Sequence, residues 1–179
     1  MKGVKVALAA QVKTKEPGSL YCPNTNQPCF CTTQCELAYA GAPKLVAIDP
    51  GPHLGFAFLK GENLHLSGML NYTYENLEYL LDLILSFEPD EIVIEDFQLF
   101  PWKATAQSWS KMETPRIIGS LEYWAYKHEI PVVYQPPSSK QAFPDARLKK
   151  MGVYVSNDHA RDAVRHGLYR IRNKEGHHA

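Results

Sequence analysis

The sequence of 179 residues has no long hydrophobic run. Hydrophobic residues make up 45% of it, yet no run approaches the roughly 20 residues that a membrane-spanning helix needs. Near the start, Lys2 and Lys5 interrupt an apolar stretch that is too short for the hydrophobic region of a secretory signal. Internal repeats and low-complexity tracts are also missing. These absences predict a cytoplasmic protein, long enough for one compact domain with a hydrophobic core.

Charge of one sign is not in excess either, because the formal net charge at pH 7 is zero. A neutral total argues at first against a nucleic-acid partner, but the charges are distributed unevenly. Residues 1–137 hold 10 Lys/Arg and 15 Asp/Glu, whereas residues 138–174 hold 9 Lys/Arg and 3 Asp/Glu. The C-terminal quarter is therefore basic, as a phosphate-contacting surface must be. A solvated helix surface without a partner would show the same pattern.

Cysteine is absent after position 35. The first 43 residues carry all four cysteines and show weak hydrophobic periodicity, so we place a boundary near Ala42–Pro43. This predicts a cysteine-containing N-terminal extension over residues 1–43 and a folded domain over residues 44–179. The cysteines follow the spacing C-x6-C-x-C-x3-C, at Cys22, Cys29, Cys31 and Cys35.

Four thiolates within 14 residues suit tetrahedral Zn²⁺, although the spacing lacks the paired C-x2-C of common zinc ribbons. Stable disulfides are not expected in a cytosolic protein. We therefore predict a structural zinc site at these cysteines, with four reduced thiols in a mobile arm as the alternative. An iron–sulfur cluster fits the spacing less well.

From Lys44 onward, short apolar runs alternate with helical periodicity. Strands are expected over 44–49, 55–59, 63–70, 91–95 and 130–135, and the first three should form an antiparallel meander. Leucines and an isoleucine recur at helical spacing, which predicts a helix over 74–87 with Thr73 as its N-cap. Other helices are expected over 104–112, from Thr114–Pro115 to about 128, over 138–150 and over 159–172. The order predicts an α/β fold with a five-stranded mixed sheet and flanking helices.

Two of the expected strands end in a carboxylate, Asp49 in the first and Glu95 in the fourth. If these strands are parallel neighbours, their carboxyl ends lie at the same edge of the sheet. His159 and Asp162 lie three residues apart on the last helix and therefore share a face. A helix that crosses this edge presents both to the same point. The pattern predicts a catalytic, metal-binding site formed by Asp49, Glu95, His159 and Asp162.

Such a set suits two-metal-ion hydrolysis of a phosphodiester. Two divalent ions roughly 3.5–4 Å apart activate a water and neutralise the charge on the leaving oxygen. Mg²⁺ prefers carboxylate and water oxygens. We expect Asp49 to bridge both ions, Glu95 to hold one and Asp162 to hold the other. His159 would either ligate the second ion or position the water, and its neutral nitrogen also suits Mn²⁺.

Each of these residues also has a purely structural interpretation. Asp49 precedes Pro50–Gly51 and is a good turn residue, and the other three could be solvated or paired locally. Asp96 and Asp158 are competing candidates. Asp96 should point to the face of the strand opposite to its neighbour, and Asp158 suits the N-cap of the last helix.

Several of these segments resemble motifs of RuvC-type Holliday junction resolvases. Residues 45–57, LVAIDPGPHLGFA, resemble the first motif, and residues 92–97, IVIEDF, resemble the second. Residues 159–166, HARDAVRH, resemble the last motif, in which a His or Asp and a second Asp lie three apart. Residues 116–140, which end in IPVVYQPPSSK, are similar to the central helix, the next strand and the following lysine. The likeness spans about residues 44–173 and is closer to phage-encoded members than to the bacterial housekeeping enzyme.

The resemblance implies an RNase H-like fold and a Mg²⁺-dependent crossover junction endodeoxyribonuclease of DNA recombination and repair. It also implies branched DNA as substrate, a homodimer, and the host cytoplasm as its location if a phage encodes it. Two features depart from the family pattern. Only Gly152–Asp158 separates the basic segment from the last motif, and the cysteine-bearing extension is not part of the pattern. An apolar helix face could serve either the core or a dimer interface; it comprises Ile117, Ile118, Leu121 and Trp124.

Aromatic residues follow Glu95 closely and are candidates for DNA contact. An aromatic side chain beside a nuclease site can stack on an unpaired base at a branch point. Phe97 suits the core, so Phe100 and Trp102 are the candidates, with packing under the loop as the alternative. Lys140 follows the fifth strand near the same sheet edge and is the first candidate for a phosphate contact. The full set of candidate phosphate contacts is Lys103, Lys140, Arg147, Lys149 and Lys150.

Three other functions compete with junction resolution. A different RNase H-fold nuclease, acting on flaps, forks or RNA–DNA hybrids, would use the same site. A DNA-binding or zinc-organised scaffold would keep the fold without cleavage. A sugar-kinase-like ATPase would use Asp49–Gly51 as a phosphate loop, but that fold needs two such domains and a much longer chain.

Overall fold

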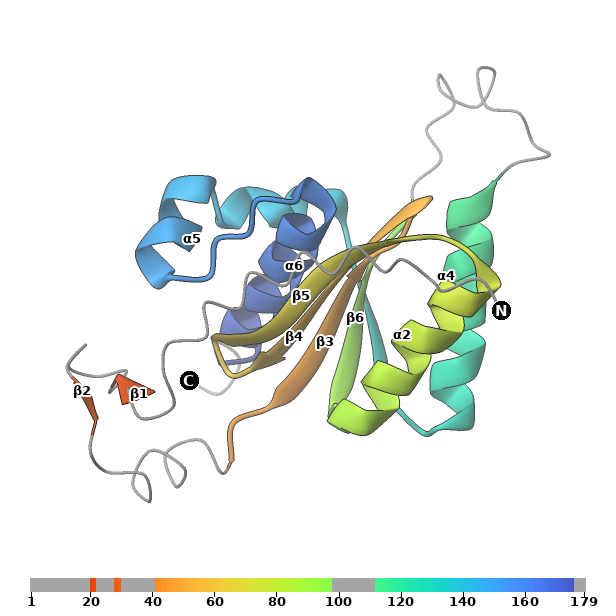
Figure 1. Cartoon of the computed structure of the whole chain (residues 1–179), viewed down its shortest axis with the longest axis horizontal. Coiled ribbons are helices and arrows are strands. Elements are labelled where there is room, and N and C mark those ends of the chain that lie inside the picture. The colour runs from red at the N-terminus through yellow and green to blue at the C-terminus, as the bar shows by residue number, and fades with distance from the viewer. Residues whose placement is uncertain (1–19, 22–27, 30–40, 98–111, 176–179) are drawn as a thin grey trace, which may run out of the picture.

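The computed structural model describes residues 20–21, 28–29, 41–97 and 112–175 of the chain (Figure 1). Two short strands, β1 (Leu20–Tyr21) and β2 (Pro28–Cys29), form an antiparallel pair. The main strands are β3 (Lys44–Asp49), β4 (His53–Lys60), β5 (Asn63–Asn71), β6 (Glu91–Glu95) and β7 (Val132–Gln135). The helices are α2 (Tyr74–Phe87), α4 (Glu113–Lys127), the 3₁₀ helix η2 (Pro137–Ala142), α5 (Asp145–Met151) and α6 (Asp158–Glu175).

The main sheet has five strands in the order β5-β4-β3-β6-β7. Strands β3, β4 and β5 form an antiparallel meander, whereas β6 runs parallel to both β3 and β7. The sheet is therefore mixed, and the first and fourth of the predicted strands are parallel neighbours. The carboxyl ends of β3, β6 and β7 all lie at one edge, which is where the chain leaves each strand for a loop or helix.

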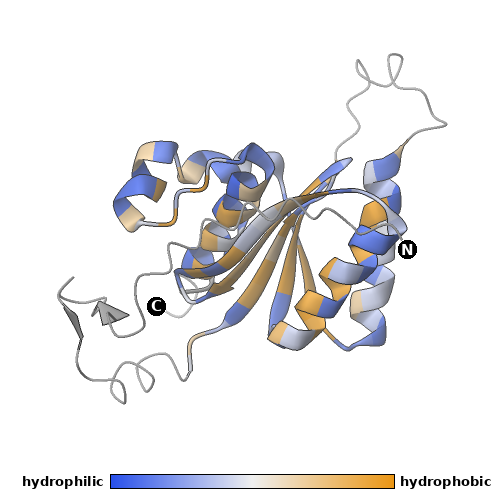
Figure 2. Cartoon of the chain, in the orientation of Figure 1, coloured by the Kyte–Doolittle hydropathy of each residue, from blue (hydrophilic) through white to orange (hydrophobic). Residues whose placement is uncertain are grey.

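Helices cover both faces of the sheet, with α2 and α4 on one face and α5 and α6 on the other (Figure 1). Side chains alternate along β3, so that Val46 and Ile48 pack under α2 and α4, whereas Leu45 and Ala47 pack under α6. A strand covered on both faces must be apolar throughout, and the hydropathy of the central strands shows this (Figure 2). Among the described residues, no helix is long and apolar enough to cross a bilayer.

The structure confirms the predicted fold class and the predicted order of strands and helices from Lys44 onward. The strands over 44–49 and 91–95 and the helix over 74–87 have the predicted bounds, and Thr73 accepts a hydrogen bond from Asn76 N–H as the N-cap of α2. The apolar face of α4 belongs to the core, because Ile117 and Leu121 are fully buried there. The helix predicted over 104–112 lies outside the described residues.

Three local predictions were wrong. The segment over 138–150 is not one helix but two, η2 and α5, because Pro144 disfavours helical geometry at the residue before it. Thr114 was expected to be the N-cap of α4 with Pro115 in the first helical position, but the helix begins at Glu113 and has no side-chain cap. Asn157, not Asp158, caps α6, since Asn157 Oδ1 accepts a hydrogen bond from Ala160 N–H at 3.0 Å.

Most of the N-terminal extension lies outside the described residues. The boundary between residues 1–43 and 44–179 therefore stays a prediction, as does zinc binding at Cys22, Cys29, Cys31 and Cys35. Of these four cysteines, the structure describes the backbone of Cys29 alone, in strand β2.

Candidate active site at the carboxyl ends of strands β3 and β6

Asp49 and Glu95 end two neighbouring parallel strands and point to the same face of the sheet. In the parallel pairing of β3 with β6, Ala47 lies opposite Val93, two residues before the carboxylates. Because alternate residues of a strand share a face, and Ala47 and Val93 both pack under α6, Asp49 and Glu95 also face α6. The backbone register alone thus brings the two carboxylates together.

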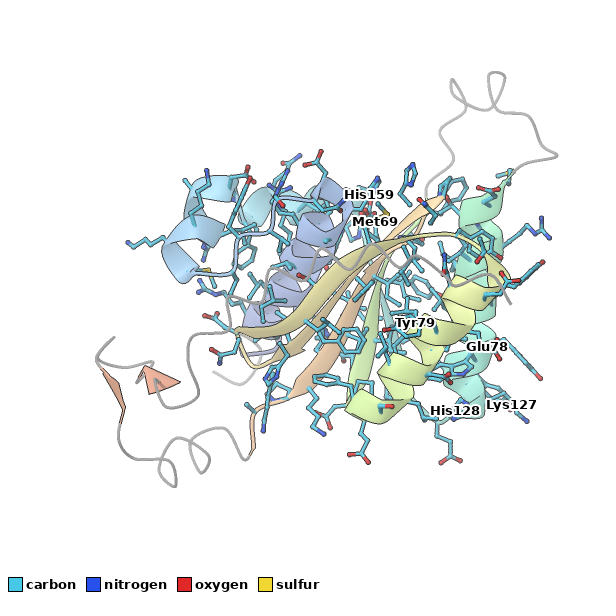
Figure 3. The ribbon with its side chains drawn as sticks, viewed as in Figure 1. Met69, Glu78, Tyr79, Lys127, His128 and His159 are labelled. Carbon is cyan, nitrogen blue, oxygen red and sulfur yellow. The ribbon has the colours of Figure 1, made fainter. Side chains whose placement is uncertain are left out.

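Helix α6 brings His159 to the same place. Its ring nitrogen Nδ1 lies 2.9 Å from Asp49 Oδ2. The first turn of α6 rests directly on β4 at Gly55, where an added Cβ would lie 2.2 Å from the backbone oxygen of His159. Within the sheet, Gly55 of β4 pairs with Met69 of β5, which is labelled together with His159 in Figure 3. The close approach of helix and strand therefore sets the contact between His159 and Asp49.

Lys140 lies between the other two carboxylates. Its ammonium nitrogen Nζ is 3.0 Å from Glu95 Oε2 and 2.9 Å from Asp162 Oδ2. The second oxygen of Asp162, Oδ1, accepts a hydrogen bond from Arg165 at 2.6 Å. The ammonium group thus connects Glu95 at the end of β6 with Asp162 on α6. Lys140 belongs to η2, the 3₁₀ helix that follows β7.

Burial changes the proton affinity of Asp49. Loss of solvent raises the pKa of this carboxyl from 3.8 to about 6, and the negative charge of Glu95 adds to the increase. The hydrogen bond with His159 and the charge of Lys140 act in the opposite direction but do not compensate. The ionised form of Asp49 is therefore unfavourable in free energy at this position, and a bound cation would offset that cost.

Glu95 shows the opposite shift. Burial alone would raise its pKa, but hydrogen bonds from His166 and Lys140 outweigh burial and lower the pKa to about 2. Burial disfavours the charged form of Lys140 as well, but Asp162 and Glu95 outweigh it, so the pKa of Lys140 is raised. At neutral pH the site therefore contains an ionised Glu95 and a charged lysine that pairs with it.

The donor atoms fit a hard divalent cation in kind, because carboxylate oxygens are the ligands that Mg²⁺ prefers. As they stand, however, no three Asp, Glu, His or Cys side chains of the described residues lie close enough together to hold a metal ion. Lys140 supplies the positive charge between Glu95 and Asp162 instead. A metal bound by Glu95 and Asp162 would therefore compete with the ammonium group for their oxygens.

No family model matches the sequence, and no curated protein matches it either. Solved structures do match. The structure of Thermus thermophilus RuvC in complex with a Holliday junction substrate aligns over 75% of this chain and 96% of its own, with a TM-score of 0.61 and 17% identity. A further structure of Thermus thermophilus RuvC aligns over 74% and 96%, with a TM-score of 0.58 and 16% identity. The chain has the RNase H-like fold of RuvC.

Within this RuvC-like fold, the structure brings together all four residues of the predicted catalytic set and places Lys140 among them. Their role in metal binding and catalysis stays a prediction. The competing candidates lie elsewhere. Asp96 lies on the α4 side of the sheet near Tyr134, and its negative charge contributes to raising the pKa of that tyrosine. The Asp158 side chain is 83% exposed and pairs with Arg161.

The predicted DNA contacts are only partly described. Phe100, Trp102 and Lys103 lie outside the described residues. Arg147, Lys149 and Lys150 lie on α5, and none of the three pairs with a carboxylate of a described residue. Arg147 lies over the ring of Phe143, with its guanidinium 4.3 Å from the ring centre, and donates a hydrogen bond to Ala142 O.

Other basic residues of the C-terminal quarter are neutralised within the chain. Arg161 pairs with Asp145 and Asp158, and Arg165 pairs with Asp145 and Asp162. Arg170 and Arg172 pair with Glu91 and Glu62. Among the described residues, the unpaired positive charge of this quarter therefore lies on α5. Asp145 connects that helix to α6 through its pairs with Arg161 and Arg165.

Two residues of the site were not predicted. His166 is fully buried on α6, and its Nε2 lies 2.9 Å from Glu95 Oε2. Its other nitrogen, Nδ1, lies 2.9 Å from Oε1 of Gln135, the last residue of β7. Helical spacing could have identified His166, because it follows Asp162 by four residues. Nothing in the local sequence distinguishes Gln135, which depends on the β6–β7 register.

Proposed function

We propose that this chain is a metal-dependent endonuclease that cleaves branched DNA, with the four-way junction as its substrate. One observation carries the proposal: Asp49, Glu95 and Asp162 converge from two strands and a helix onto one end of the sheet. The fold supports it, since the RuvC structure that aligns with this chain holds a Holliday junction substrate.

Divalent ions, when bound, activate a water molecule and neutralise charge on the leaving oxygen. In this proposal Asp49, Glu95 and Asp162 hold those ions. His159 keeps Asp49 oriented through the 2.9 Å contact, and because its side chain is 44% exposed it can also reach the attacking water. Lys140, once displaced from a carboxylate, can contact a phosphate oxygen of the DNA.

The substrate and assembly follow from the symmetry of a four-way junction. Its resolution needs two cuts in strands of like polarity, so a homodimer with one site in each copy suits the reaction. Two of the competing functions, another RNase H-fold nuclease and a non-catalytic scaffold, are outcomes of the same assay. We expect the purified chain with Mg²⁺ or Mn²⁺ to cut a four-way junction in preference to a flap, a linear duplex and an RNA–DNA hybrid of matched sequence.

Equal cleavage of the linear duplex would contradict junction resolution and favour a different RNase H-fold nuclease. Absence of cleavage of every substrate with both metals would favour the non-catalytic scaffold. The oligomeric state is measured on the same preparation by light scattering, where a monomer that still cleaves junctions would contradict the homodimer.

Helix α5 is the proposed phosphate-binding element, because Lys149 and Lys150 are exposed and have no acidic partner among the described residues. We expect the double substitution Lys149→Ala/Lys150→Ala to weaken binding to junctions of any sequence. Each lost phosphate contact should reduce the slope of log K against log salt by about 0.9, hence by roughly 2 for the pair. Lys127→Ala is the control, since Lys127 is exposed at the end of α4 on the other face of the sheet (Figure 3).

The measurement is a titration of labelled junction DNA with Ca²⁺ in place of Mg²⁺, repeated at several salt concentrations. A slope that is unchanged in the α5 double variant, or reduced as much in the Lys127 variant, would show that α5 does not contact the phosphates.

A further inference from the structure

A buried histidine lies behind the proposed metal ligand Glu95. His166 is fully buried on α6, as are the apolar residues Ala163, Val164 and Leu168 of the same helix. An imidazole costs free energy in such surroundings unless its nitrogens have hydrogen-bond partners. Both nitrogens have one, at 2.9 Å each, and the two partners are Glu95 and Gln135.

The backbone holds both partners in register. Gln135 lies opposite Glu95 in the parallel pairing of β6 with β7, so the two side chains share the face that packs against α6. Gln135 is itself 5% exposed, and its amide can either accept or donate at the imidazole. The three residues thus form a continuous buried row that begins at β7, passes through α6 and ends on the carboxylate of Glu95.

His166 and Lys140 contact the same carboxylate oxygen of Glu95. Glu95 Oε2 contacts both His166 Nε2, at 2.9 Å, and Lys140 Nζ, at 3.0 Å. A metal that binds Glu95 would compete with Lys140 for its carboxylate oxygens, whereas His166 is buried on α6 and can remain in place. His166 is therefore the contact that can hold the carboxylate in one orientation both with and without metal.

We propose that His166 is a positioning residue for Glu95 and that Gln135 orients His166. The inference rests on the proposed function, because it takes Glu95 as a metal ligand. Hydrogen-bond partners of metal ligands fix the ligand's orientation, and their loss typically lowers metal affinity or activity about 10–100-fold. His166 does not touch the substrate, so its effect passes through Glu95.

The test compares three single variants with the parent chain. His166→Leu keeps a buried side chain of similar size but removes the contact to Glu95, whereas His166→Gln retains a donor that can reach it. Val164→Ala is the packing control, since Val164 is equally buried two residues away and its apolar side chain cannot form a hydrogen bond with Glu95. Each is measured for Mn²⁺ affinity by calorimetry, for thermal unfolding without metal, and for junction cleavage.

We expect His166→Leu to weaken Mn²⁺ binding about 10–100-fold. His166→Gln should restore most of the affinity, and Val164→Ala should lower the unfolding temperature without changing the affinity. Because Gln135 acts through His166, adding Gln135→Leu to His166→Leu should cause little further loss of affinity.

The outcomes separate this inference from the proposed function. If the parent chain cleaves junctions and His166→Leu binds Mn²⁺ as tightly as Val164→Ala does, the positioning role is wrong and the nuclease function stands. If His166→Leu loses Mn²⁺ affinity but the parent cleaves no substrate, the nuclease function is wrong and the positioning role stands. Absence of Mn²⁺ binding by the parent overturns both.

Discussion

Asp49→Asn is expected to slow junction cleavage severely and, in the same protein, to stabilise the metal-free fold at neutral pH. Asparagine has the size of aspartate and keeps an oxygen for the contact with His159, but it carries no charge to hold a divalent ion. Loss of this proposed ligand should reduce the cleavage rate on the order of 1000-fold, which corresponds to about 4 kcal/mol in activation free energy.

The gain in stability follows from the raised pKa of Asp49. Its side chain is 13% exposed, and its pKa in the folded chain is about 6, compared with 3.8 for the ordinary group. The folded state therefore binds the proton more tightly than the unfolded state. This contribution to stability is fully present below about pH 4 and is lost as the pH rises through about 6. At pH 7 the ionised carboxylate costs up to roughly 3 kcal/mol, which asparagine avoids.

Urea unfolding of both proteins between pH 4 and pH 8, in the presence of a chelator, measures this difference. The Asp49→Asn variant should exceed the parent by an amount that grows up to about pH 6 and is constant above it. Asp82→Asn, at an exposed position on α2, is the control and should change neither cleavage nor the pH profile. Cleavage at the parental rate by the Asp49 variant would show that Asp49 is not needed for catalysis. A loss of stability at pH 7 would show that burial does not disfavour the ionised form of Asp49.

The part of the site that could be predicted depends on strand ends and on helical spacing. Asp49 and Glu95 each end an apolar run, and the alternation of side chains along a strand is regular, so the sequence indicates which carboxylates share a face. Asp96 could be rejected in the same way, since it follows Glu95 and points to the opposite face. His159 and Asp162 needed only the period of a helix.

The part that could not be predicted depends on contacts between elements that are distant in the sequence. Gln135 acquires a role through its register with Glu95. Lys140 was expected near this edge of the sheet, but its pairing with Glu95 and Asp162 depends on the course of η2 and was not predicted. The basic character of the C-terminal quarter was misleading for α6, where Arg170 pairs with Glu91, a residue 79 positions earlier. Pairing of this kind leaves no local pattern in the sequence.

Gly55 should tolerate no side chain. A Cβ on Gly55 would lie 2.2 Å from the backbone oxygen of His159 and 2.4 Å from its carbonyl carbon. Backbone atoms cannot rotate away as the end of a flexible side chain can, so Gly55→Ala must push the first turn of α6 off the sheet. Overpacking costs typically 1–3 kcal/mol, and a clash with backbone belongs at or above the upper end, so we expect a loss of about 3 kcal/mol or more.

The same displacement should separate His159 from Asp49. A misplacement of about 1 Å in an active site can cost roughly 100-fold in rate, so we expect junction cleavage to fall at least that far, even where the variant is still folded. Gly119→Ala is the matched control, because a Cβ at this exposed position in α4 meets no atom within 4 Å. Alanine favours a helix over glycine, so this control should gain roughly 0.5–1 kcal/mol and cleave normally.

Urea unfolding and junction cleavage of the two glycine variants, measured side by side, test the placement of α6. Parental stability in Gly55→Ala would mean that the helix does not rest on β4 at this residue. Reduced stability with full cleavage would mean that α6 can shift without moving His159 from Asp49. Glycine-to-alanine substitution is thus expected to lower stability at Gly55 and to raise it at Gly119. The difference arises because one Cβ meets the backbone of α6, whereas the other points into solvent.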